Sequence, residues 1–239
     1  QSWYSERGAN LWVCAPSNGL PSESGITTTD IRGSYGYSPY DYTDDFGGTS
    51  SATPYISGVV AFMLSTNPNL TYRDIRYILA KTARKVDPTD TDWTTNAGGF
   101  SINHKYGFGV VDTFAAVNLS KTFSSLGGYN SLIIYESPNN TTNTIAVSDS
   151  GISKIEFVEV NVNFSSTNFG NTNITLQSPS GTQAKLVETH QCDPSCASYS
   201  YKTWRFGVSR FLDETPIGNF VLTVTSGTLH YWSIKIYGR

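Results

Sequence analysis

The feature that most constrains the fold is a change of hydrophobic periodicity near Gly127-Gly128. Before this point apolar residues recur at the three- and four-residue spacing of helices, and after it apolar and polar residues alternate, as on half-buried strands. Turn signals separate the alternating runs, which cover 155–164, 173–176, 220–225 and 231–237. The pattern predicts an all-β sandwich of roughly 110 residues after a boundary near 124–129.

The first half of the chain has the pattern of an α/β protein. The apolar run 11–15, ended by a proline, predicts a short buried strand. A helix is expected over about 50–65, and it is expected to be buried because its residues are apolar or small on nearly all sides. A second helix follows Thr71, an N-cap residue with Asp74 at the capping-box distance, and a third begins at about Asp112.

Composition argues against several classes of protein. The 239 residues carry a formal net charge of −3, with 15% charged and 13% aromatic side chains. The sequence has no run of about 18 apolar residues, so no transmembrane helix is expected. The slightly acidic balance argues against nucleic acid as the main partner. Disorder is not expected, because apolar and aromatic residues recur throughout.

The three cysteines give a weaker indication. Cys192 and Cys196 lie four residues apart in a turn-like stretch, which favours a small loop disulfide and hence an oxidising compartment. A partial metal site formed with His190 is the alternative, although no fourth ligand is evident. Cys14 lies within an apolar run and is expected to be a buried free thiol.

The segment with the clearest chemical meaning is the Gly-Gly-Thr-Ser stretch at 47–50, which leads directly into the first helix. Glycines let a substrate approach the backbone closely, and a helix N-terminus offers N–H groups that can stabilise an oxyanion. Pro54 lacks the N–H that would bond the carbonyl of Ser50, so the first turn is locally open. This pattern favours Ser50 as a nucleophile. The alternative is an ordinary capped helix after a glycine turn.

The full string Gly-Thr-Ser-x-Ala-x-Pro, which begins at Gly48, resembles the nucleophile motif of subtilisin-like serine proteases. Several flanks resemble the kexin/furin branch of that family and its P domain, at 3–6, 26–30, 67–75, 92–96, 104–112, 176–182 and 214–224. The resemblance implies the C-terminal part of a subtilisin-like, parallel-sheet α/β peptidase domain over 1–125. It also implies a jelly-roll-like β-sandwich, the P domain, over 126–239.

By this resemblance the chain is part of a serine endopeptidase in which Ser50 attacks the scissile carbonyl and its backbone N–H helps to hold the oxyanion. In subtilisin-like enzymes the Asp and the base His precede the Ser. His104, His190 and His230 all follow Ser50, so none is assigned as the base, and His104 is expected to be structural.

The chain opens at Gln1 without a Met or a leader, as a processed piece would. Because the expected Asp and base His precede Ser50, we expect a separate N-terminal chain of the same precursor, with domain swapping or an artificially shortened chain as the alternatives. This N-terminal chain would supply the base His, the Asp and the oxyanion Asn, and it would cover the apolar helix after Ser50.

The resemblance carries further expectations. Glu23 lies where the kexin/furin branch places an acidic ligand of a structural calcium ion, and the alternative is a solvated loop glutamate. The protein is expected to be secreted, extracellular or periplasmic, and to act on proteins or peptides. Two rival functions stay open: a catalytically inactive subtilase-like binding or structural assembly, and an adhesive or carbohydrate-binding role for the sandwich.

Overall fold

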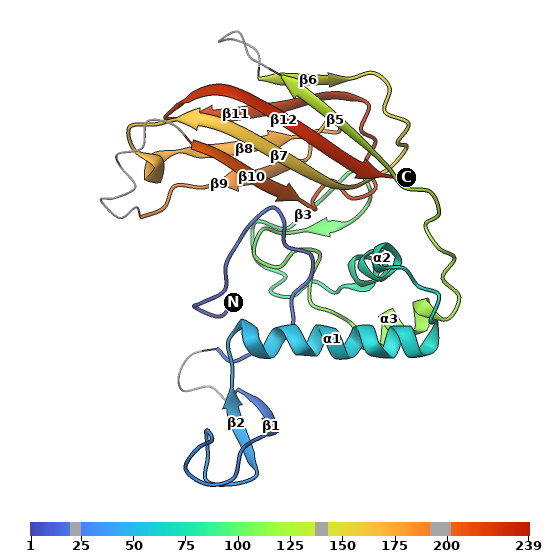
Figure 1. The fold of residues 1–239 in the computed structure, drawn as a ribbon, viewed down its shortest axis with the longest axis vertical. Coiled ribbons are helices and arrows are strands. Elements are labelled where there is room, and N and C mark those ends of the chain that lie inside the picture. The colour runs from blue at the N-terminus through green and yellow to red at the C-terminus, as the bar shows by residue number, and fades with distance from the viewer. Residues whose placement is uncertain (20–24, 137–142, 192–201) are drawn as a thin grey trace. The chain divides into compact units, whose positions relative to one another are not determined.

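The computed structural model describes residues 1–19, 25–136, 143–191 and 202–239 (Figure 1). The chain forms two compact units. Unit 1 comprises Gln1–Arg7, Trp12–Asp90 and Phe108–Ser125, and unit 2 comprises Gly8–Leu11, Thr91–Gly107 and Leu126–Arg239. In the part of the chain that is described, no helix is both long and apolar enough to cross a membrane.

Unit 1 is built from helices around one small apolar core. Helix α1 spans Thr49–Thr66, α2 spans Tyr72–Thr82 and α3 spans Thr113–Ser120. Both α1 and α2 pack against α3. The core consists of the side chains that these helices and the adjoining loops turn inward: Val59, Met63, Leu70, Ile78, Leu79, Val111 and Ala116.

The second and third helices begin where the sequence predicts, because local caps fix their first turns. Thr71 Oγ1 accepts the Asp74 N–H at 3.2 Å, and the Asp74 carboxylate accepts the Thr71 N–H at 2.9 Å. This reciprocal pair is a capping box. At α3, the Asp112 carboxylate accepts the Ala115 N–H at 2.9 Å.

Helix α1 corrects the prediction of a buried helix. Only Ser51, Val59 and Met63 are buried along it, whereas Phe62 is 62% exposed and Tyr55 is 44% exposed. The helix is apolar or small around most of its circumference, but its neighbours in unit 1 cover one stripe only. The rest of its apolar surface is open in the described structure.

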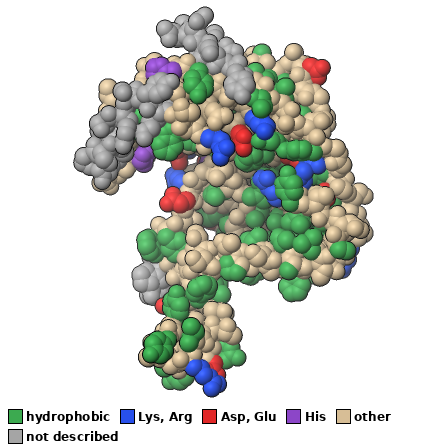
Figure 2. Space-filling model, viewed as in Figure 1, with side chains coloured by type: hydrophobic (Ala, Val, Ile, Leu, Met, Phe, Trp, Pro, Cys, Tyr) green, Lys and Arg blue, Asp and Glu red, His purple; other side chains and the backbone are tan. Residues whose placement is uncertain are grey.

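A hairpin of two antiparallel strands precedes α1. Strand β1 spans Ile26–Thr29 and pairs with β2, which spans Tyr42–Phe46. Figure 2 shows hydrophobic side chains gathered on this hairpin. Tyr35, in the segment between its two strands, is 90% exposed. The strand β2 then leads directly into the glycines before Ser50.

The run 11–15 corrects the prediction of a short buried strand. Cys14 makes only an isolated parallel bridge with Val110, which also makes an antiparallel bridge with Arg84. The Trp12 carbonyl also accepts the Phe108 N–H at 2.8 Å, but the pairing does not extend into a ladder. Cys14 is a free cysteine, as predicted, but it is half-buried rather than buried. Burial raises the pKa of its thiol to about 11.

Unit 2 contains two four-stranded antiparallel sheets, with strand orders β10-β7-β12-β5 and β6-β11-β8-β9 (Figure 1). The short 3-10 helix η1, Phe169–Asn171, lies between β7 and β8. The strands are β5 (Asn130–Glu136), β6 (Thr144–Val147), β7 (Ile155–Ser165), β8 (Asn173–Gln177), β9 (Gln183–Val187), β10 (Lys202–Val208), β11 (Gly218–Thr225) and β12 (Thr228–Gly238).

Alternating side chains of both sheets fill the core of unit 2. Opposite residues Val160 and Ile234 on β7 and β12 are both fully buried, as the period of two in the sequence predicts. The core includes Ile145, Val158, Leu176, Phe211, Phe220, Leu222 and Trp232. The alternating runs predicted as strands are therefore confirmed.

The segment Thr91–Gly107 also belongs to unit 2. It contains the two-stranded pair β3 (Thr94–Thr95) and β4 (Ser101–Ile102). The Asn96 side chain fixes it by donating to the carbonyl oxygens of Arg210 at 2.8 Å and Leu212 at 2.9 Å. The chain thus passes between the units several times, and the predicted domain boundary near residue 125 stays a prediction.

Candidate active site

Ser50 is the second residue of α1 and is exposed to solvent. The preceding N-cap residue, Gly48, has φ 75° and ψ −178°, a backbone conformation that is essentially restricted to glycine. No described side chain caps the N-terminus of α1. An exposed hydroxyl therefore lies at a helix start whose N–H groups can act as hydrogen-bond donors.

A hydrogen-bonded scaffold, which the sequence reasoning missed, holds the backbone before α1. Asn18 Oδ1 accepts the Gly48 N–H at 3.0 Å, and Ser17 Oγ donates to the Gly48 carbonyl at 2.7 Å. The Tyr4 hydroxyl donates to Asn18 Oδ1 at 2.6 Å. A Cβ on Gly47 would lie 2.1 Å from Asn18 Oδ1. The glycine at this position therefore lets the amide of Asn18 reach the turn.

None of the three histidines belongs to the unit that contains Ser50. Ser50 is in unit 1, and all three histidines are in unit 2. The exposed His190 is hydrogen-bonded through Nδ1 to the Glu188 carbonyl at 2.9 Å. His230 Nε2 lies 2.8 Å from Ser165 Oγ. That none of them serves as the base of Ser50 stays a prediction.

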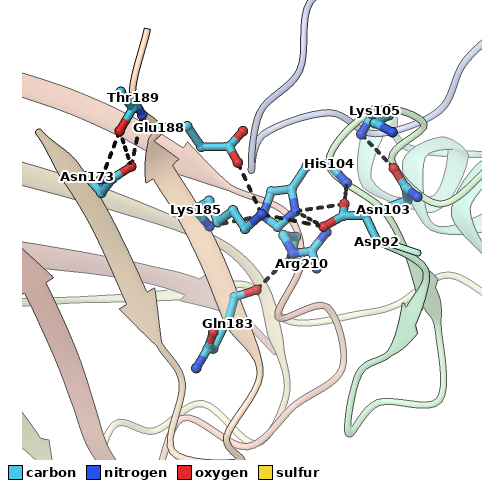
Figure 3. Close-up of polar contacts among 10 residues, drawn as sticks. All are labelled: Asp92, Asn103, His104, Lys105, Asn173, Gln183, Lys185, Glu188, Thr189 and Arg210. Carbon is cyan, nitrogen blue, oxygen red and sulfur yellow. Dashed lines mark hydrogen bonds and ion pairs between the residues drawn. The ribbon is translucent and has the colours of Figure 1, made fainter. Parts of the chain in front are cut away.

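His104 is buried in unit 2 with both ring nitrogens engaged (Figure 3). Its Nδ1 lies 2.9 Å from Asp92 Oδ2, and its Nε2 accepts the Lys185 N–H at 2.9 Å. Because Nε2 accepts, the proton of the neutral ring is on Nδ1 and is donated to Asp92. The imidazole thus joins the segment Thr91–Gly107 to strand β9, in agreement with a structural role.

The surroundings of His104 and Asp92 keep the imidazole neutral. Burial is the main cause that lowers the pKa of His104 from 6.5 to about 4, and the positive charge of Arg210 acts in the same direction. Burial by itself would raise the pKa of Asp92, but the hydrogen bond from the His104 N–H and the nearby charges lower it overall. At neutral pH a neutral ring therefore lies against an ionised carboxylate.

Several predicted residues lie outside the described part of the chain: Glu23, Cys192 and Cys196. Across the described residues, no group of three or more His, Cys, Asp or Glu side chains is arranged to hold a metal ion. The calcium site at Glu23, and the choice between a disulfide and a partial metal site at the two cysteines, stay predictions.

Two family models match the chain in succession. Residues 1–109 match the subtilase family of S8 peptidases, and residues 155–236 match the proprotein convertase P-domain. The first match contains Ser50 and the glycine turn, and the second contains most strands of the sandwich.

Curated relatives align with 99% of this chain. Furin-1 of Xenopus laevis is 29% identical over 254 residues, and 31% of its length is covered. Human proprotein convertase subtilisin/kexin type 5 is 30% identical over 263 residues, with 14% of its length covered. The chain therefore spans less than a third of either relative.

The solved structure of the serine protease of Aeromonas sobria has the same fold. It superposes on 100% of this chain and 56% of its own, with a TM-score of 0.91 and 22% sequence identity. The same protease in complex with the chaperone ORF2 gives an equal TM-score.

Taken together, the fold and the matches define a subtilase segment followed by a proprotein convertase P domain. The chain is similar to curated furins and proprotein convertases over nearly its whole length. This confirms the kexin/furin resemblance of the sequence motifs. It also confirms the fold class, an α/β part followed by an all-β sandwich.

Proposed function

We propose that Ser50 is the nucleophile of a kexin-like serine endopeptidase to which this chain contributes Ser50 and the P domain. The observation that carries the proposal is the exposed Ser50 at the uncapped start of α1. The glycine turn before it is fixed by Asn18 and Ser17. A rigid support of this kind is what a positioned nucleophile needs, because small displacements of reacting groups are costly in rate.

In the proposed reaction, Ser50 Oγ attacks the carbonyl carbon of a peptide bond while a histidine base takes its proton. Negative charge then develops on the carbonyl oxygen, and the Ser50 N–H at the positive end of the α1 dipole stabilises it. The base returns the proton to the leaving amine, and water hydrolyses the acyl-enzyme. His104 is a poor candidate for the base, because both of its ring nitrogens are already engaged.

We infer that the base His, its Asp partner and the oxyanion Asn come from an N-terminal polypeptide of the same precursor. Two observations support this. The three histidines all lie in unit 2, and α1 exposes apolar side chains, including Tyr55 and Phe62, that soluble proteins usually cover. The same polypeptide would cover this face and supply the strands of the parallel sheet that the subtilisin-like resemblance implies.

A fluorophosphonate probe tests the proposal on the intact protease. We expect mass spectrometry to find the label on Ser50, and Ser50→Ala to lower peptide hydrolysis by about 10⁴-fold or more. The matched control is Ser57→Ala, an exposed serine of the same helix that is hydrogen-bonded to the Thr53 carbonyl. Its activity should stay within about twofold of the parent. A folded protease with neither label nor hydrolysis would indicate the rival function, an inactive subtilase-like assembly.

The proposal includes a structural calcium ion at Glu23 and an extracellular or periplasmic location. A carboxylate is a suitable ligand for calcium, and a pair of closely spaced cysteines suits an oxidising compartment. If Glu23 binds calcium, Glu23→Gln should lower the melting temperature in the presence of calcium but not in the presence of EDTA. Equal melting temperatures in calcium would contradict this ligand.

A further inference from the structure

Unit 2 contains a polar pocket of about 460 Å³ beside His104 and Asp92. Segments far apart in the sequence meet there, and its walls include Asp92, Asn96, His104, Lys185 and Arg210. Figure 3 shows several of these side chains around the imidazole. The volume is more than ten times the share of a water molecule in the liquid, which is about 30 Å³.

Arg210 is the unusual member of this wall. Arg210 is only 5% exposed, and its Nε donates to the Gln183 carbonyl at 3.0 Å. Its Nη1 is buried, and none of the described residues accepts a hydrogen bond from it. A buried cation with an unpaired donor is costly unless another group completes its hydrogen bonds. Burial lowers the pKa of this guanidinium to about 10.

The nearby carboxylates are engaged elsewhere. Asp92 accepts from the backbone N–H and the ring Nδ1 of His104. Glu214 accepts from Ser178, Thr182 and the Ala97 N–H. Within the described residues, neither forms an ion pair of 4.0 Å or less with Arg210.

The chemistry of the pocket selects among possible anions. A carboxylate oxygen matches the N–H groups of the Arg210 guanidinium in the pocket wall, and such charge-assisted hydrogen bonds are the strong ones. The ammonium of Lys185, about half-exposed, is ion-paired with Glu188 at 3.1 Å and lies 3.9 Å from Asp92 Oδ1, so Arg210 is the main cation offered to the ligand. A dianion such as phosphate is disfavoured, because the ionised Asp92 in the wall repels the second negative charge.

We propose that this pocket binds a singly charged carboxylate, which pairs with the guanidinium of Arg210. The carboxylate belongs either to a free small organic acid or to the C-terminus of a peptide. The site is separate from the proposed chemistry at Ser50, so the two proposals stand or fall independently.

Calorimetric titration of the full chain at constant ionic strength tests the proposal. The probes are acetate, a short neutral peptide with a free C-terminal carboxylate, the same peptide as its C-terminal amide, and inorganic phosphate. We expect saturable binding of acetate or of the acid peptide, and at least about tenfold weaker binding of the amide and of phosphate. Saturation by acetate alone identifies a small-acid site, and tighter binding of the acid peptide identifies a chain terminus. Equal binding of phosphate, or no saturation by either carboxylate, would overturn the proposal.

Variants locate the site. Arg210→Met should weaken carboxylate binding at least about tenfold, and Arg210→Lys should restore part of it, because the charge is kept. The control is Arg205→Met, which removes an exposed arginine of β10 and should leave the affinity unchanged. Unchanged binding in the folded Arg210→Met variant would contradict the assignment.

A second measurement needs no variant and applies if Arg210→Met does not fold. A ligand that binds only the folded chain raises its melting temperature. We expect the acid peptide or acetate to raise the melting temperature of the chain, and the amide peptide or chloride at the same ionic strength not to do so. Equal melting temperatures in all four would overturn the proposal.

Discussion

Replacing His104 by Phe should weaken the attachment of the segment Thr91–Gly107 to β9. The substitution removes the charge-assisted hydrogen bond to Asp92, worth about 1.5–3 kcal/mol, and the bond from the Lys185 N–H, worth about 0.5–1.5 kcal/mol. The ring volume is largely kept, so the cavity left behind is small. We expect the free energy of unfolding to fall by about 2–4 kcal/mol at pH 7.5.

The same site predicts how stability depends on pH. The pKa of His104 is about 4 in the folded protein against 6.5 for an unperturbed histidine, so the unfolded state binds more protons between these values. The part of the free energy of unfolding that depends on a neutral His104 is therefore fully present above pH 6.5 and is lost as the pH falls toward 4. The whole shift corresponds to roughly 3 kcal/mol, of which about 2 kcal/mol is lost by pH 5.

Urea unfolding of the parent and His104→Phe, followed by tryptophan fluorescence at pH 7.5, 6 and 5, measures both quantities. The difference in free energy of unfolding between the parent and His104→Phe should be about 2 kcal/mol smaller at pH 5 than at pH 7.5, because only the parent has this histidine to protonate. In the parent, Asp92 does not titrate within this window, because its pKa is lowered. His190→Phe, at an exposed position of the same unit, should change stability by less than about 0.5 kcal/mol. A difference in free energy of unfolding between the parent and His104→Phe that stays constant from pH 7.5 to 5 would contradict a lowered pKa of His104 in the folded protein.

Three further substitutions or reactions test other parts of the structure. Gly47→Ala should slow fluorophosphonate labelling of the protease about tenfold or more, because the new Cβ would lie 2.1 Å from Asn18 Oδ1; an unchanged labelling rate would show that the scaffold does not matter. Thr71→Ala should lower the free energy of unfolding by about 1 kcal/mol in thermal melts, since it removes the cap of the Asp74 N–H, and a change near zero would contradict the capping box. Cys14, whose thiol pKa is about 11, should react with iodoacetamide at pH 8 roughly tenfold more slowly than an ordinary thiol; an ordinary rate in the Cys14 peptide by mass spectrometry would count against its burial.

The parts of the fold that were predictable are those fixed by neighbouring residues. The capping box of Thr71 and Asp74 and the strict alternation along β7 and β12 are local patterns, so the sequence shows them directly. Ser50 at the start of α1 was likewise expected, because the glycines, the helix and the nucleophile motif are contiguous.

The missed features depend on long-range packing. Asn18 bonds to Gly48 from 30 positions away and is itself bonded by Tyr4 from 14 positions away. Asn96 bonds to carbonyls 114 and 116 positions away. No periodicity signals such contacts. In this chain α1 is buried along one stripe only, for a related reason: hydrophobicity indicates that a surface can be covered, but only the neighbouring elements determine whether it is.

The labelling of Ser50 in two preparations of this chain tests its proposed activation most directly. One contains the chain alone, and the other contains it with the polypeptide that carries the base histidine. We expect a fluorophosphonate to label Ser50 at least about 10³-fold faster in the second preparation, because a serine hydroxyl without a base is a weak nucleophile. Equally fast labelling of the folded chain alone would contradict the claim that another polypeptide activates Ser50.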